Sequence, residues 1–169
     1  MGKRWTMAAV ILTSLALSAT QGAPAPADKN KAKGEKTDYK VYNSYFVSNK
    51  AGIKDGSTYK AFADQTSFGT IFRPAPPLIG KKREYLPKDV FDAKIVATVI
   101  KQGNKMVEYK VEKATVDKDT LYVQYTTTSK DTPTATFASS LILTVDKGKI
   151  ATVIFLEDGK KVGTAKVEQ

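Results

Sequence analysis

Residues 95–111, IVATVIKQGNKMVEYKV, decide the fold of this chain. The first six are apolar or β-branched on both faces of an extended segment, which is typical of a strand buried on both sides. Gly103-Asn104 then provides a tight turn. After the turn apolar and charged residues alternate, so we expect Tyr109 and Val111 to face a core. The stretch predicts a central strand, a turn and then a half-buried strand.

Strand patterns continue along the rest of the chain. Short polar or glycine-containing turns separate the further segments that we expect to be extended, which are residues 40–47, 121–126, 138–145, 150–156 and 161–167. The sequence therefore predicts a mainly β fold, either an antiparallel sandwich or a partly open barrel of about seven strands with one short helix.

The one expected helix runs from Thr58 to Ser67. Tyr59, Phe62, Ala63 and Thr66 recur at the i, i+3, i+4, i+7 spacing of a helix face. Ser57 precedes this run and is a suitable residue to cap its first turn.

The first 38 residues differ in composition from the rest. Lys3 and Arg4 precede an apolar run from Met7 to Leu17, and small residues follow. This pattern predicts a secretory signal over residues 1–22, cleaved after Gly22, with cleavage after Ala19 or Ala23 as the alternatives. Residues 23–38, rich in Ala, Pro and Lys, predict a flexible linker. A single domain is then expected over residues 39–169.

Export to the periplasm or the extracellular space follows from the predicted signal. The chain contains no cysteine, so a lipid anchor attached through cysteine is not expected, and no disulfide can stabilise the domain. The chain also contains no histidine. Nucleophile–histidine pairs and zinc sites of the usual Cys/His kind are therefore excluded.

Other catalytic arrangements have little support in the sequence. Ser57 and Lys60 have the spacing of a Ser-Lys pair, but a capping role explains Ser57 better. The aspartates fall mostly in turns, where their side chains bond nearby backbone amides. We expect no catalytic residue, no metal site and no cofactor.

A proline-rich strip is the best candidate for contact with a partner. Three prolines fix the backbone and withhold donors from a strand ladder, and basic residues flank them. A preordered segment loses less entropy when it docks. The candidate residues are Arg73, Pro74, Pro76, Pro77, Lys81, Lys82 and Arg83. The alternative is a rigid crossover that packs its apolar residues on the sheet.

The formal net charge of +10 favours acidic partners. Because most lysines are dispersed, a solvated surface also explains the charge. An anionic glycan or a membrane surface is the alternative class of partner, and nucleic acid is not expected for an exported chain.

The second half of the chain resembles the C-terminal domain of the PrcB-type family of exported bacterial accessory proteins. The resemblance covers about residues 57–167. The segments that carry it follow in order: TYKAFADQTSF at 58–68, Leu86-Pro87, Asp89-Val90-Phe91, IVATVI at 95–100, VEYKVEKATV at 107–116, TLYVQYTTT at 120–128, Pro133 in a loop, and SLILTVDKGKIATVIFLEDGKKV at 140–162.

The resemblance implies a non-enzymatic subunit or regulator associated with a secreted protease. Members of the family often carry Thr-Gly-Gly-Tyr where this chain has residues 104–109, of which only Tyr109 is kept, and many are lipoproteins. The function expected from the sequence is an exported binding protein that stabilises or regulates a secreted protease or another partner protein.

Overall fold

The computed structural model describes residues 34–77, 83–131 and 136–168. The predicted signal, most of the predicted linker, and Lys81 and Lys82 lie outside the described residues. The elements are β1 (Glu35–Lys36), β2 (Tyr39–Tyr42), β3 (Tyr45–Val47), the 3-10 helix η1 (Asn49–Ala51), β4 (Gly56–Phe62), α1 (Gln65–Ile71), β5 (Phe72–Pro74), α2 (Val90–Ala93), β6 (Lys94–Gly103), β7 (Lys105–Asp117), β8 (Thr120–Asp131), β9 (Phe137–Asp146), β10 (Thr152–Glu157) and β11 (Lys160–Glu168).

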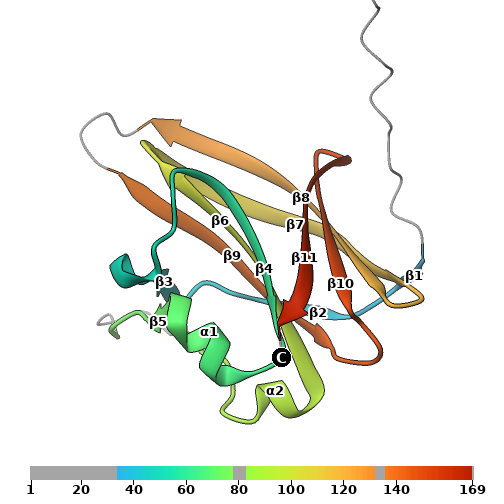
Figure 1. The fold of residues 1–169 in the computed structure, drawn as a ribbon. Helices are drawn as coiled ribbons and strands as arrows, with labels where there is room; N and C mark the ends of the chain where they lie inside the picture. The colour runs from blue at the N-terminus through green and yellow to red at the C-terminus, as the bar shows by residue number, and fades with distance from the viewer. Residues whose placement is uncertain (1–33, 78–82, 132–135, 169) are drawn as a thin grey trace, which may run out of the picture.

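The described strands form one curled sheet and one small sheet (Figure 1). The curled sheet has nine strands in the order β1-β7-β8-β10-β11-β4-β6-β9-β2, and β3 pairs with β5 in the small sheet. The mainly β fold and the partly open barrel are thus confirmed. Two neighbouring pairs, β8 with β10 and β4 with β11, are parallel. The sheet is therefore mixed, whereas the sequence predicted an antiparallel one.

Strand β6 lies between two apolar clusters, as its sequence predicts. All residues from Ile95 to Ile100 are buried. Ile95, Ala97 and Val99 point into the barrel, where they belong to a cluster that we call the lumen cluster. Its buried members are Ala61, Ala63, Ile95, Ala97, Val99, Ala114, Leu121, Val123, Tyr125, Leu141, Leu143, Val145, Ile150, Val153, Phe155 and Ala165. Val96 and Ile100 belong to an outer cluster on the opposite face. Burying each Val or Ile side chain contributes about 1.5–3 kcal/mol, so this strand anchors both clusters.

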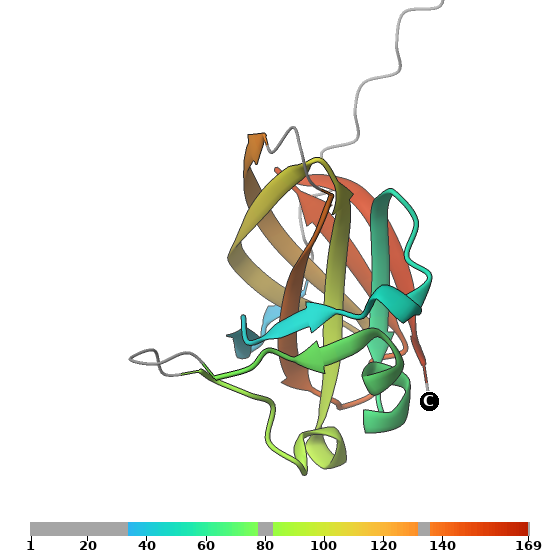
Figure 2. The ribbon, with the colours of Figure 1, turned by 90° about the vertical axis from the view of Figure 1, so that its left-hand side faces the viewer.

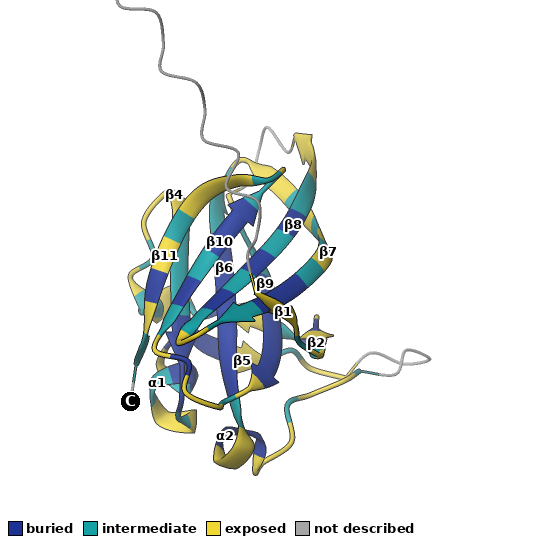
Figure 3. Ribbon diagram, turned by 90° about the vertical axis from the view of Figure 1, so that its right-hand side faces the viewer, coloured by how far each residue is buried: buried dark blue, intermediate teal, exposed yellow. Residues whose placement is uncertain are grey.

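The outer cluster is covered by the small sheet and by the two helices, which lie against one side of the curled sheet (Figure 2). Its buried members are Tyr42, Val47, Phe62, Phe68, Ile71, Phe72, Val90, Phe91, Val96, Ile100 and Ile142. Phe68 stacks on Phe72 with 4.9 Å between ring centroids and meets Phe62 edge to face. The outer faces of β7, β8 and β10 carry no such layer of described residues (Figure 3).

The expected helix at Thr58–Ser67 is wrong, because Gly56–Phe62 forms strand β4. In this strand Tyr59 and Ala61 contact the lumen cluster while Phe62 belongs to the outer cluster. Burial on both faces favours a period of two and overrides the helical spacing. The helix begins later, at Gln65, where the Asp64 side chain accepts a hydrogen bond from the Ser67 amide.

Two further boundaries differ from the expectation. Glu35 and Lys36, which the sequence places in the linker, pair with Val116 and Thr115 of β7. The strand expected at residues 40–47 is divided into β2 and β3, which belong to different sheets. The expected orientation of β7 is confirmed, since Tyr109 and Val111 pack against the lumen cluster.

A glycine permits an aromatic side chain to cross the lumen. A Cβ atom added to Gly163 would lie 2.3 Å from the Cδ2 atom of Tyr59, whose ring packs on Phe155. No real Cβ tolerates such a contact, so Gly163 is required by the close approach of the ring and not by its backbone angle.

We expect Gly163→Ala to lower the free energy of unfolding by about 1–3 kcal/mol because it overpacks the lumen. Gly103→Ala is the matched control, since an added Cβ there meets nothing within 4 Å. Chemical denaturation of both variants measures the difference. If the Gly163→Ala variant is as stable as the Gly103→Ala variant, Tyr59 does not lie over β11.

Candidate functional site

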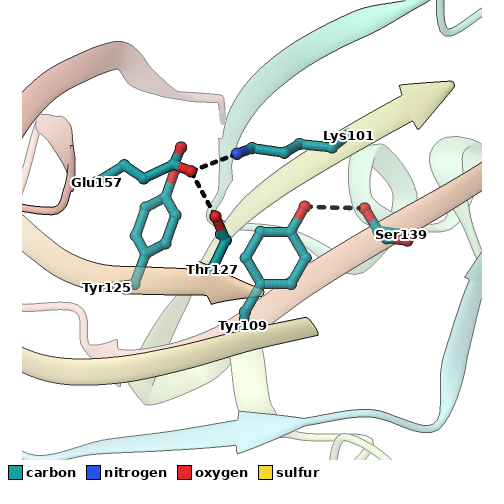
Figure 4. A network of polar contacts seen from close by, with 6 residues as sticks. All are labelled: Lys101, Tyr109, Tyr125, Thr127, Ser139 and Glu157. Atoms are coloured by element: carbon teal, nitrogen blue, oxygen red, sulfur yellow. Dashed lines mark hydrogen bonds and ion pairs between the residues drawn. The ribbon is translucent and has the colours of Figure 1, made fainter. Parts of the chain in front are cut away.

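Polar side chains gather at one end of the barrel, which we call the barrel mouth (Figure 4). They come from five strands of the sheet and lie at the end of the lumen cluster. The residues of the barrel mouth are Lys101 of β6, Tyr109 of β7, Tyr125 and Thr127 of β8, Ser139 of β9 and Glu157 of β10.

An ion pair crosses the barrel mouth from β10 to β6. Lys101 Nζ lies 2.5 Å from Glu157 Oε1, and the two side chains are 22% and 16% exposed. The Thr127 hydroxyl donates to the same carboxylate oxygen at 2.6 Å. The Tyr125 hydroxyl approaches the other oxygen at 3.5 Å. One carboxylate thus joins three strands that are not all neighbours in the sheet.

Ser139 joins β7 to β9, which share no backbone ladder among the described residues. The Val107 amide donates to Ser139 Oγ at 2.9 Å, and the Tyr109 hydroxyl donates to the Ser139 carbonyl at 3.1 Å. The Tyr39 hydroxyl donates to the Val111 carbonyl on the same side of β7. Side chains therefore partly close the barrel where strand pairing does not.

The shifted pKa values in the barrel mouth move away from neutrality. Burial is the main cause that raises the pKa of Tyr109 and of Tyr125. Burial would also raise the pKa of Glu157, but hydrogen bonds from Lys101 and Thr127 outweigh it and hold that pKa below the ordinary value. At neutral pH both phenols stay protonated and the carboxylate stays charged. These three groups are poor acids and bases for catalysis near pH 7.

The hollow beside the barrel mouth is small. It has a volume of about 210 Å³ and is lined by Gly56, Ser57, Lys101, Gln102, Gly103, Asn104, Lys105 and Val107. Buried side chains of the lumen cluster fill the barrel below it. The described lumen therefore has no room for a drug-sized ligand, which needs about 300 Å³ or more.

The Ser-Lys spacing does not produce a catalytic pair. Ser57 and Lys60 lie on opposite faces of β4 because they are three residues apart in a strand. Lys60 forms an ion pair with Glu168. Within the described ranges no group of three or more acidic side chains could hold a metal ion. In the same ranges, none of the helices has the length and apolar character that a membrane span requires.

The proline-rich strip lies on the outer surface, beside the small sheet. Arg73 and Pro74 belong to β5, and they, Pro76 and Pro77 are exposed. Arg83 is half-buried and its Nε atom is buried, so its charge is less available than we expected. Lys81 and Lys82 lie outside the described residues, and the structure does not place them beside the prolines.

Hydrogen bonds hold the strip at Ala75, between the exposed prolines. The Ala75 amide donates to the Ser44 carbonyl at 2.8 Å. The Ala75 carbonyl accepts from the Tyr85 hydroxyl at 2.8 Å. Both backbone groups of one residue are thus bonded to the domain, which fixes the prolines on either side in an extended, outward position.

The sequence analysis missed two apolar side chains beside the strip. Phe46 is 47% exposed and lies opposite Arg73 in the small sheet. Tyr85 is 39% exposed and packs edge to face on Tyr45. The pattern YFV at 45–47 indicated a strand, but nothing in it indicated which aromatic ring faces solvent. We call Phe46 and Arg73, which share one face of the small sheet, together with Pro74, Pro76 and Tyr85 beside them, the ribbon patch.

Comparisons with known proteins found no match. Neither the protein-family models, nor the curated proteins, nor the solved structures gave one. The resemblance to the PrcB-type family therefore stays a prediction.

We expect Glu157→Gln to lower the free energy of unfolding by about 1–3 kcal/mol near neutral pH. The variant leaves Lys101 half-enclosed without its counter-charge, a loss between those of exposed and buried ion pairs. Glu84→Gln is the control, because it removes the solvent-exposed pair with Lys40 and should change the free energy of unfolding much less.

The effect of Glu157 should also depend on pH. Since its folded-state pKa lies below the ordinary 4.5, its stabilisation is present above that pH and is lost as the pH falls through the lowered value. The difference in Tm between the wild type and E157Q should therefore be constant at neutral pH and shrink in acid. A difference that grows in acid would contradict the assigned ion pair.

Proposed function

We propose that this chain is an exported, non-catalytic binding protein that docks a partner protein on the ribbon patch. The observation that carries the proposal is the fixing of Ala75 through both of its backbone groups. This arrangement presents Pro74 and Pro76 in one conformation before any partner arrives. Preordering of this kind reduces the entropic cost of association.

The composition of the ribbon patch supports a protein partner. Aromatic residues and arginine are enriched at the centres of protein interfaces. Phe46 and Tyr85 provide apolar area, and Arg73 provides a planar charged group with no ion-pair partner among the described residues. An extended proline segment typically docks in an aromatic-lined groove of its partner. A groove of that kind is the partner surface that fits best.

The barrel mouth supports a non-catalytic role. Its polar side chains bond to groups of other strands within the barrel, and its shifted pKa values lie far from neutrality. We assign it to the stability of the barrel. Export, and stabilisation or regulation of a secreted protease, are the biological setting that the signal-like start and the PrcB-type resemblance favour.

Site-specific photo-crosslinking in the producing cell tests the proposed docking surface. A photoreactive phenylalanine analogue at position 46 should capture one defined partner, identified by mass spectrometry. The same group in place of Lys149, an exposed residue of the loop between β9 and β10, should not capture it. Equal capture at both positions, or none at position 46, would contradict the proposal.

With the captured partner in hand, Phe46→Ser and Arg73→Ser should each weaken binding by about tenfold or more. The Tm should change little because both side chains are exposed. Titration with salt distinguishes a protein partner from the alternative class of partner. An anionic glycan or membrane surface would be released steeply as salt rises, whereas an interface with an apolar centre persists.

A further inference from the structure

The second half of β8 has an open edge among the described residues. Strand β10 pairs with β8 from Thr120 to Tyr125 and ends there, because Asp158-Gly159 turns the chain into β11. The arrowhead end of β8 continues past the end of β10 (Figures 1 and 3). Only β7 pairs with β8 from Thr126 to Asp131.

The backbone groups that face this edge can be assigned. The Val107 amide and the Val111 carbonyl point away from β8, toward Ser139 and Tyr39. In an antiparallel pair the residues opposite them also direct their backbone groups outward. Ser129 lies opposite Val107, and Thr127 lies opposite Tyr109, which has the same orientation. Tyr125 has the same orientation as Thr127 and Ser129, and its carbonyl accepts from the Asp158 amide at 3.1 Å. This hydrogen bond confirms that the three residues direct their backbone groups away from β7.

Thr127 and Ser129 therefore present amides and carbonyls that have no partner among the described residues. Unpaired strand edges of this kind accept an added strand. An extended peptide offers donors and acceptors at the regular spacing of a strand, whereas the hydroxyls of a glycan and the groups of a lipid headgroup do not repeat at that spacing. The geometry points to a polypeptide as the occupant.

The charges around the edge favour an acidic segment. Lys130 at the end of β8, and Lys160 and Lys161 after the turn that ends β10, are exposed and have no ion-pair partner among the described residues. Asp131 is paired with Lys105, which leaves Asp158 in the turn and Glu108 of β7 as the opposing charges, fewer than the three lysines. A second copy of this chain would bring two such lysine groups together, and their repulsion disfavours it.

A hollow lies over the β7–β8 ladder beside the edge. It has a volume of about 160 Å³ and is lined by Met106, Glu108, Thr128, Ser129 and Lys130. Met106 is 42% exposed there, although it is large and apolar. An occupant that alternates apolar and acidic residues would direct its carboxylates to the face of the sheet that carries Lys130 and its apolar side chains to the opposite face.

We propose that the edge of β8 at Thr127 and Ser129 binds an acidic, extended segment of a partner protein by strand addition. This surface lies on β8 and not on the ribbon patch, so the two proposals fail independently.

The probe is a capped peptide, Glu-Val-Glu-Val-Glu-Val-Glu, titrated into the isotope-labelled full domain. The amide signals of Thr127 and Ser129 should shift and become protected from hydrogen exchange. The same peptide with alternate N-methylated amides should bind at least about tenfold more weakly, because it lacks the backbone donors of an added strand. No shift with the unmodified peptide, or equal binding of the N-methylated one, would overturn the proposal.

Variants of the chain test the contributions of the backbone edge and of the nearby lysines separately. Ser129→Pro removes an outward amide and leaves the ladder to β7 in place, so binding should fall about tenfold. Ser129→Ala keeps the amide and should bind as the wild type does. Replacing Lys160 and Lys161 by Ser should weaken binding about tenfold at low salt, while the same change at Lys147 and Lys149, in the loop between β9 and β10, should not.

If Ser129→Pro unfolds the domain, the lysine variants and the N-methylated peptide still decide the proposal. Analytical ultracentrifugation of the free chain excludes or reveals self-association. A dimer that Ser129→Pro dissociates would overturn the acidic peptide as occupant. Loss of binding in both lysine variants alike would show only general charge attraction and would also overturn it.

Discussion

The burial of β6 on both faces is the constraint on which the rest of the structure depends. A strand with apolar residues at 95–97, 99 and 100 cannot leave either face in water without a large loss of hydrophobic stabilisation. The barrel covers one face with the lumen cluster, and the small sheet and helices cover the other with the outer cluster. The ribbon patch is the exposed side of that second cover. The candidate docking surface therefore exists because the central strand needs two layers around it.

The barrel mouth differs from the two proposed docking surfaces in how its polar groups are bonded. At the barrel mouth the polar side chains bond one another, so their hydrogen bonds and charges are largely used within the fold. On the ribbon patch and along the open edge of β8 the same kinds of group point to solvent. Groups that are satisfied internally stabilise the fold, whereas exposed and preordered groups can bind a partner at low entropic cost. This contrast favours a docking role for the outer surface of the barrel over one for the barrel mouth.

Sequence patterns predicted the parts of the fold that local chemistry determines. The two-sided burial of β6, the break between β6 and β7 at Gly103-Asn104 and the inward direction of Tyr109 follow from periodicity and turn chemistry. The pairing of β6 with β4 and β9 instead of β7 does not follow from them, because β4 and β9 are distant from β6 in sequence. The strand at Gly56–Phe62 could not be predicted in this way, because helical spacing and alternation coincide over so short a segment and only tertiary burial distinguishes them. The strip was found from its prolines and charges, but its anchoring needs Ser44 and Tyr85, and such contacts between distant residues leave no periodic signal.

Native-state hydrogen exchange tests the central role of β6 most directly. If this strand anchors both clusters, the amides of Val96, Ala97 and Val99 should exchange only through global unfolding, and those of Thr128 and Lys130 in the extended half of β8 should exchange through local opening at much lower free energy. The account predicts that destabilising either cluster accelerates exchange in β6 by the full change in global stability. Exchange of β6 that is as fast as that of the free end of β8, or that responds to only one cluster, would contradict it.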